Sequence, residues 1–158
     1  MSLAEQTIDN DGASVSLTRI PVEYVDSYWP KVAGFLEKAV NESRGRYDIE
    51  SLYLEIIRGS SHLWILFEGD DEAVSAFTTQ FVHYPLKLNL SLVFLGADDS
   101  DESFNGRLQA WGALMPEVLE WARLHGCSGL EIIGRRGWLR VLKDQGFKES
   151  YLMIESEV

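Results

Sequence analysis

Apolar side chains recur every three to four residues in the first third of the chain, which is the spacing of helices that bury one face. Asp26 or Ser27 caps a first helix that runs to about residue 41, and Asp48 caps a second helix that ends at Gly59. The buried face of the first helix is predicted to be Trp29, Val32, Phe35, Leu36, Ala39 and Val40. The polar residues 1–16 before it predict a flexible N-terminal segment.

In the middle of the chain the apolar spacing changes to two, which is typical of strands. Residues 62–68, 73–84 and 87–95 each show this alternation. Gly69-Asp70-Asp71 supplies the first turn between them, and Pro85 interrupts the pattern at the second. The three segments therefore predict an antiparallel meander with short turns.

The last third of the chain alternates between helical and strand patterns. The elements are a helix over residues 105–125, a strand over 130–133, a helix from Arg136 or Gly137 to Gly146, and a strand over 151–154. The long helical connection predicts that strand 130–133 pairs parallel with the third strand of the meander. The order α-α-β-β-β-α-β-α-β thus predicts an α/β fold with one mixed sheet, in a single domain over residues 17–158.

Composition and charge narrow the classes of function. The chain has 158 residues, 46% of them hydrophobic, and a formal net charge of -11, so a packed globular protein is expected and nucleic acid is not its default partner. The single cysteine, Cys127, excludes an internal disulfide and a cysteine-built metal site, and it fits a cytoplasmic setting. The apolar stretches are far shorter than the roughly 20 residues that span a bilayer. We therefore expect no membrane partner and, from the polar N-terminus, no signal peptide.

Two stretches near the C-terminus resemble the GCN5-related N-acetyltransferase (GNAT) superfamily. EWARLHGCSGLEI is similar to that family's third helix running into its fifth strand, and WLRVLKDQGFKE to its fourth helix and the Gly-Phe turn after it. WPKVAGFLEKAV, HLWI, His83-Tyr84-Pro85 and GRRGW together resemble short GNAT-like proteins of bacteriophages and prophages. The resemblance covers the chain from about residue 17 and implies the GNAT fold. The activity it implies is transfer of an acetyl group from acetyl-CoA to an amine.

The same resemblance implies a glycine-rich turn whose backbone N–H groups hold the pyrophosphate of the cofactor. The corresponding stretch is residues 106–111, where Gln109 and Trp111 occupy the two positions at which the phosphates approach the main chain. We expect the Trp111 side chain to fill the space that the phosphates need, so the acetyl-CoA motif is interpreted as degenerate. Under a transferase interpretation, the cofactor contacts are Asn105, Gly106 and Arg107.

The acid and base of the family's reaction are also incomplete. The family often places a proton-donating tyrosine four residues before the glycine of the Gly-Phe turn, and this chain has Leu142 there. The candidate catalytic bases are Glu131 and His83, although for each the preferred interpretation is a surface residue at a strand end. His62 and His125 have no companion ligands in the sequence, so no metal site is predicted.

The turn Gly134-Arg135-Arg136-Gly137 is basic within an acidic chain. Free N–H groups at a helix start and guanidinium groups both favour an anion, and a neighbouring indole can stack on a planar group. The predicted anion- or partner-binding residues are Arg135, Arg136, Trp138 and Arg140. The preferred interpretation of this stretch is nevertheless a tight turn whose arginines neutralise the protein's own acidic run at residues 98–102.

Three functions stay open at this point. The preferred one is a GNAT-fold binding protein of phage origin whose acetyl-CoA chemistry is lost or strongly altered. Its partner is an unidentified phage or host protein, and its location is the bacterial host cytoplasm or the virion. The second is a divergent acyl-CoA-dependent N-acetyltransferase, and the third is an acidic decoy of a nucleic-acid-binding protein. Homodimer formation through exposed aromatic side chains also stays open.

Overall fold

A computed structural model describes most of the chain. The described residues are 6–8, 14–97, 104–133, 142, 144, 146–150 and 153–158, with the backbone alone for 6–8 and 104–110. No helix in this part of the chain is long and apolar enough to cross a membrane.

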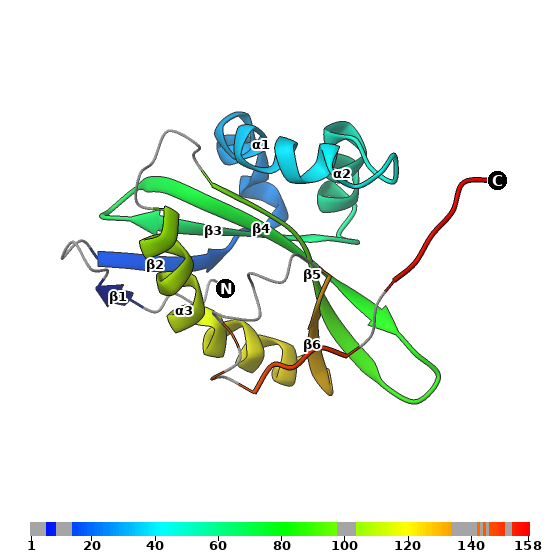
Figure 1. The fold of residues 1–158 in the computed structure, drawn as a ribbon. Coiled ribbons are helices and arrows are strands. Elements are labelled where there is room, and N and C mark those ends of the chain that lie inside the picture. The colour runs from blue at the N-terminus through cyan, green and yellow to red at the C-terminus, as the bar shows by residue number, and fades with distance from the viewer. Residues whose placement is uncertain are drawn as a thin grey trace.

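A mixed sheet forms the centre of the fold, with six strands among the described residues (Figure 1). In order across the sheet they are β1 (Gln6–Ile8), β2 (Ser14–Arg19), β3 (His62–Glu68), β4 (Glu72–His83), β5 (Leu88–Ala97) and β6 (Gly129–Ile132). Neighbours from β1 to β5 are antiparallel, whereas β6 runs parallel to β5. The predicted fold class, an α/β fold with an antiparallel meander and then a parallel crossover, is therefore confirmed.

Helices cover both faces of this sheet (Figure 1). The short helix η1 (Val22–Tyr24) leads into α1 (Val25–Asn41), which lies with α2 (Ile49–Ile57) on one face, while α3 (Phe104–Leu124) covers the other. Asp48 caps α2 as predicted, since its Oδ1 accepts a hydrogen bond of 2.7 Å from the N–H of Ser51. The start of α1 differs from the prediction. It begins at Val25 with no side-chain cap, because η1 already turns the chain into the helix.

Two apolar layers follow from the alternation of side chains along the strands. In β3, the buried Trp64 and Leu66 face α3, and the buried Leu63 and Ile65 face α1 and α2. This alternation decides on which side of the sheet each candidate site residue lies.

The N-terminal strands correct the sequence analysis. It predicted a flexible segment over residues 1–16, whereas the structure places β1 and the first part of β2 there. Val15 and Leu17 of β2 are buried, and the strand pairs with β3 up to Arg19 beside Trp64. The strand reads S-V-S-L-T-R, so its polar composition concealed a period of two that its pairing with β3 makes stable.

Most of the predicted last helix lies outside the described residues, as do Tyr151 and Leu152 of the predicted closing strand. Leu142 is helical, in agreement with the prediction. Met153 and Ile154 are the described part of the predicted closing strand, and they are not in a strand. This part of the prediction is wrong. The chain instead turns toward the loop between α1 and α2, where the Met153 sulfur lies 3.8 Å from a guanidinium nitrogen of Arg46.

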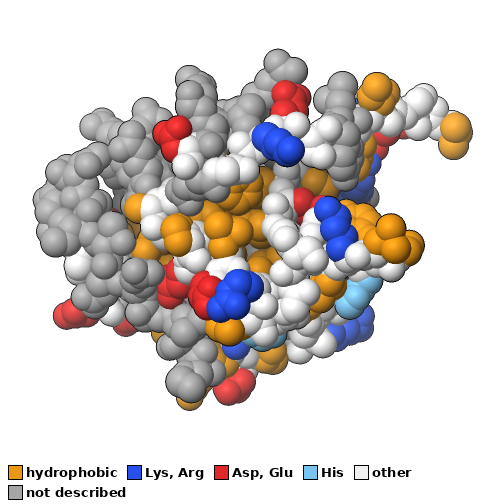
Figure 2. All heavy atoms as spheres, turned by 90° about the horizontal axis from the view of Figure 1, so that it is seen from below, with side chains coloured by type: hydrophobic (Ala, Val, Ile, Leu, Met, Phe, Trp, Pro, Cys, Tyr) orange, Lys and Arg blue, Asp and Glu red, His pale blue; other side chains and the backbone are white. Residues whose placement is uncertain are grey.

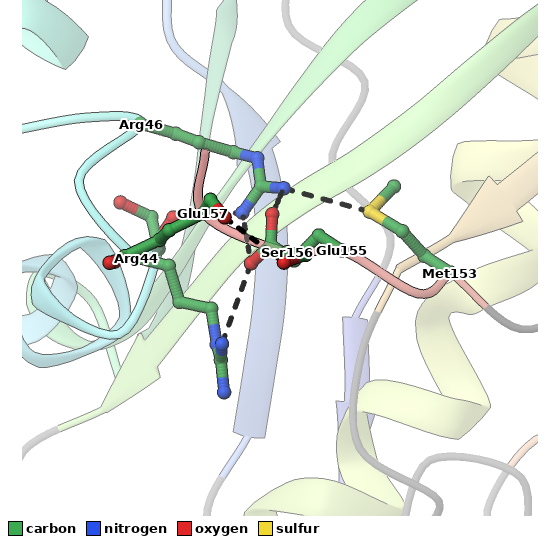
Figure 3. A network of polar contacts seen from close by, with 7 residues as sticks. Arg44, Arg46, Met153, Glu155, Ser156 and Glu157 are labelled. Atoms are coloured by element: carbon green, nitrogen blue, oxygen red, sulfur yellow. Dashed lines mark hydrogen bonds and ion pairs between the residues drawn. The ribbon is translucent and has the colours of Figure 1, made fainter.

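That contact belongs to a small polar network at the C-terminus (Figure 3). Arg44 and Arg46, in the turn after α1, both form ion pairs with Glu155. Since these groups are largely exposed, solvent screens the pairs and they contribute little to stability. The network nevertheless places the described C-terminal residues beside the helices α1 and α2.

Candidate functional site

Glu131 is the predicted site residue that the structure surrounds with polar partners. The Tyr84 hydroxyl donates to its carboxylate, at 2.8 Å from Oε1 and 3.0 Å from Oε2. The side-chain amide of Asn89 donates to Oε2 at 3.1 Å. The β4–β5 hairpin, which carries Tyr84 and Asn89, therefore holds a carboxylate from β6, more than forty residues further along the chain, and we name these three residues the Glu131 site (Tyr84, Asn89 and Glu131).

The strand register explains this arrangement. In the parallel pair, Asn89 lies beside Gly129 and Ser91 beside Glu131, so Asn89 and Glu131 project on the same face of the sheet. Leu90 points the opposite way, into the layer under α3. The Glu131 site thus lies on the face that carries α1 and α2. Tyr84 reaches it from the turn between β4 and β5, whose backbone closes with a 2.9 Å bond from Tyr84 N–H to the Lys87 carbonyl.

The Glu131 carboxylate is a hydrogen-bond acceptor that two donors, Tyr84 and Asn89, hold in place. A carboxylate has about four lone-pair positions, and two donors fill only part of them. Asn89 is 6% exposed, and its Oδ1 has no hydrogen-bond partner among the described residues. The remaining carboxylate capacity, at the half-buried Glu131, can accept a proton or an N–H group from an amine.

The second predicted base, His83, is not part of this site. It is the exposed last residue of β4 and pairs with Leu88 across the turn. The structure brings its neighbour Tyr84, rather than His83 itself, to Glu131. The sequence analysis did not single out Asn89, and it named Tyr84 only within the resemblance to phage proteins. Neither the strand period nor the Tyr-Pro turn indicates which carboxylate the hydroxyl reaches.

The predicted cofactor contacts, Asn105, Gly106 and Arg107, all lie in the first turn of α3. The first four N–H groups of a helix have no partner inside it, so this turn keeps free donors in its backbone. From Leu108 to Trp111, each N–H donates to the carbonyl four residues before it. The stretch 106–111, which was predicted to replace the glycine-rich turn, is therefore helical throughout.

The position of Trp111 corrects the expected steric block. Its side chain is 2% exposed and packs in the layer under α3, with its ring 4.1 Å from that of Phe77. Its indole N–H donates to the Ser75 hydroxyl at 3.0 Å. An amphipathic helix of this length turns one side to the sheet, and Trp111 lies on that side. Its bulk fills the core rather than the space outside the helix start.

The remaining predicted residues divide into two groups. Arg135, Arg136, Trp138 and Arg140, the predicted anion- or partner-binding residues, lie outside the described residues. Leu142, at the position of the family's proton donor, is 2% exposed and belongs to the core under α3.

The histidines that appeared unrelated in the sequence meet at one indole. The ring of His62 lies 5.0 Å from that of Trp121, and the ring of His125 stacks on the same indole at 4.1 Å. Burial, followed by the charges of Arg19 and His125, lowers the pKa of His62 to about 4. Within the described residues, no group of three or more histidine, cysteine or acidic side chains is placed to hold a metal ion.

The lowered pKa of His62 predicts acid-sensitive stability. Folding favours the neutral ring, so this contribution is complete above pH 6.5 and is lost as the pH falls toward 4. The full shift corresponds to about 3 kcal/mol, and solvent contact of the half-buried ring reduces the expected loss to about 2 kcal/mol. Urea unfolding at pH 7 and pH 4 measures it. The variant His62→Phe should lose about 2 kcal/mol less than the unmodified chain over this range, whereas the exposed control His83→Gln should match the unmodified chain. An equal pH dependence in all three proteins would show that His62 titrates normally.

Comparison with solved structures supports the fold. Over 91% of this chain and 97% of the other, the structure is similar to a possible acetyltransferase from Clostridium difficile 630, with a TM-score of 0.62 and 12% identity. An aminoglycoside acetyltransferase from an uncultured soil metagenomic sample gives a TM-score of 0.65 at 10% identity, covering 91% and 98% of the two chains. A predicted acetyltransferase from Clostridium acetobutylicum, solved with acetyl-CoA, gives 0.62 at 8% identity, covering 90% and 96%. No protein-family model and no curated protein matches the chain.

Similarity at these identities shows the fold alone. The chain has the GNAT fold, in agreement with the resemblance of its C-terminal stretches.

Proposed function

We propose that this protein uses the GNAT fold for binding and does not transfer acetyl groups. The observation that carries the proposal is the continuous helix α3, which runs through the stretch 106–111. In a helix, the N–H groups from Leu108 to Trp111 are bonded internally and are not available to a pyrophosphate. Within α3, the backbone donors without helical partners lie in its first turn, which begins at Phe104. This stretch therefore fits the phosphates of acetyl-CoA poorly.

The proton donor gives separate support. Leu142 has no exchangeable proton, and its side chain is part of the apolar core under α3. A thiolate leaving group would thus receive no proton from this position.

The proposed role is association with another protein. The chain carries 25 acidic against 14 basic residues, so a basic surface is its natural complement. A phage origin and a phage or host partner remain our proposal, to be tested by the neighbouring genes and by co-purification from infected cells. Partner binding that weakens steeply above physiological salt would favour the acidic-decoy form of this function.

Calorimetry with acetyl-CoA tests the proposal directly. We expect no saturable heat at micromolar concentrations and no release of free coenzyme A with small primary amines. Arg107→Gln is the matched variant, since it removes the one cationic side chain predicted to contact the cofactor. Micromolar binding that Arg107→Gln weakens would contradict the proposal and restore the cofactor site.

The second candidate is a divergent acyl-CoA-dependent N-acetyltransferase, and the Glu131 site favours it. The carboxylate is held by Tyr84 and Asn89 and keeps acceptor capacity for an amine proton. If the chain has transferase activity, Glu131→Gln should lower kcat/KM by about 10²–10⁴-fold. His83→Gln should leave it unchanged, because His83 is outside this site. Equal losses in the two variants would exclude Glu131 as the specific base.

A further inference from the structure

Arg19, His62 and His125 form a second polar cluster on the opposite face of the sheet from the Glu131 site. We name these three residues the Arg19 cluster. The Arg19 guanidinium carbon lies 5.6 Å from the centre of the Trp121 ring, which both histidine rings also contact. Figure 2 views the molecule from the side of α3, and apolar and cationic side chains both reach the surface there.

The fold builds this cluster from three elements. Arg19 at the end of β2 pairs with Trp64, and His62 lies two residues before Trp64 in β3, on the same face. Trp121 and His125 are four residues apart at the end of α3, so they lie one above the other. The end of α3 therefore covers the ends of two strands and brings all three basic side chains together.

Hydrogen bonds determine which ring nitrogens remain for a ligand. The Thr79 hydroxyl accepts the Trp64 indole N–H at 3.0 Å and lies 2.9 Å from His62 Nδ1. The hydroxyl keeps its own hydrogen after accepting from the indole, and in the tautomer in which it donates this hydrogen to Nδ1, neutral His62 carries its proton on Nε2. His125 Nδ1 lies 2.8 Å from the Trp121 carbonyl and therefore donates to it. His62 Nε2–H is thus left as a donor, and His125 can donate through Nε2 once it is protonated.

Arg19 is the cation of the cluster. Its Nε is buried and has no hydrogen-bond partner among the described residues. In the described part of the chain no carboxylate forms an ion pair with it. In a chain of net charge -11, this arginine instead lies over the Trp121 ring that two histidines also contact. A buried guanidinium donor without a partner is costly, and an oxyanion would satisfy it.

The carbonyl end of α3 opposes an anion, because a helix C-terminus carries partial negative charge. Several of these carbonyls are already bonded, however. The N–H of His125 donates to Trp121 and that of Cys127 to Ala122, at 3.2 and 3.0 Å. These bonds occupy the carbonyls of Trp121 and Ala122, which reduces their opposition to an anion.

We propose that the Arg19 cluster binds a small oxyanion, a carboxylate or a phosphate, held by the Arg19 guanidinium and His62 Nε2–H with His125 at its rim. This site lies across the sheet from Glu131 and goes beyond the proposed function. It also differs from the anion site predicted at Arg135 and Arg136.

The test is a titration of the full chain with inorganic phosphate at constant ionic strength, followed by NMR of the histidine rings. A parallel titration with acetate distinguishes a carboxylate ligand from a phosphate. We expect saturable shifts of the His62 and His125 signals. Arg19→Gln should weaken the response about tenfold or more, since it removes a charged donor. The control Arg123→Gln should not change it, because Arg123 is an exposed arginine of α3 that pairs with Glu120.

Circular dichroism will show whether Arg19→Gln folds. If it does not fold, His125→Gln provides a second test of the site. His125 is exposed, so this variant should fold and bind the anion more weakly. Weaker binding in the folded variants, with Arg123→Gln unchanged, supports the site. A linear response of the unmodified chain to both anions, or a saturable response that neither Arg19→Gln nor His125→Gln alters, would overturn it.

Discussion

Replacing Gly96 by alanine should destabilise the protein by about 3 kcal/mol or more, because among the described glycines whose surroundings are known it is the one where a Cβ would meet backbone atoms. A Cβ at this position would lie 1.7 Å from the carbonyl oxygen of Phe35 and 2.5 Å from its carbonyl carbon. Both atoms belong to the backbone of α1, so no side-chain rotation relieves the clash. The helix would have to move away from β5, which would open the layer between them.

Gly34→Ala is the matched control for this substitution. Gly34 lies in α1, one residue before Phe35, and a Cβ there meets nothing within 4 Å. Alanine is favoured over glycine within a helix, so this variant should be more stable by about 0.5–1 kcal/mol. Urea unfolding of both variants measures the two effects. If Gly96→Ala left the free energy of unfolding unchanged, the close contact between α1 and β5 would be wrong.

Trp111→Ala should destabilise the protein by about 3–5 kcal/mol, as expected when a large aromatic side chain is removed from a packed core. The indole packs edge-on against Phe77 and donates to Ser75, whose hydroxyl in turn donates to the Gly96 carbonyl at 2.9 Å. This relay connects α3 to β4 and β5. Its loss therefore leaves both a cavity and a buried hydroxyl with one partner fewer.

Two further variants separate these contributions. Trp111→Phe keeps most of the apolar contact and loses the indole donor, so it should cost about 1–2 kcal/mol. Leu124→Ala, at a position of α3 that is 61% exposed, should change stability by less than about 0.5 kcal/mol. A small effect of Trp111→Ala would mean that the indole lies outside the core. The sequence interpretation of Trp111 as an obstacle to phosphate would then regain its basis.

The strands of the meander and the helices α2 and α3 could be predicted from the sequence because their signals are local. The alternation in residues 62–68 and the Asp48 cap depend only on neighbouring residues. β2 was missed because its strand character depends on pairing with β3, more than forty residues further along the chain. The alternation within β2 itself is short and follows a polar segment, so the local pattern was too weak to predict a strand.

The candidate sites also depend on contacts between distant segments, which local sequence patterns do not reveal. Glu131 was selected as a carboxylate at the beginning of a strand, but its partners Tyr84 and Asn89 come from other segments. His62 and His125 were judged unrelated because they are far apart in the sequence, whereas both contact Trp121. Contacts of this kind depend on strand register and on the position of a helix over the sheet, and neither is encoded in a local pattern.

The sequence by itself determined the order and type of most elements, the acidic charge and the absence of a tyrosine at Leu142, because periodicity, composition and residue identity are properties of the chain alone. The tertiary structure alone decided that Trp111 turns into the core, that Glu131 is held by a tyrosine and an amide, and that Arg19 and two histidines meet around Trp121. The physical reason is that the direction and partners of a side chain are set by what packs against its element, and for these residues that partner is distant in sequence.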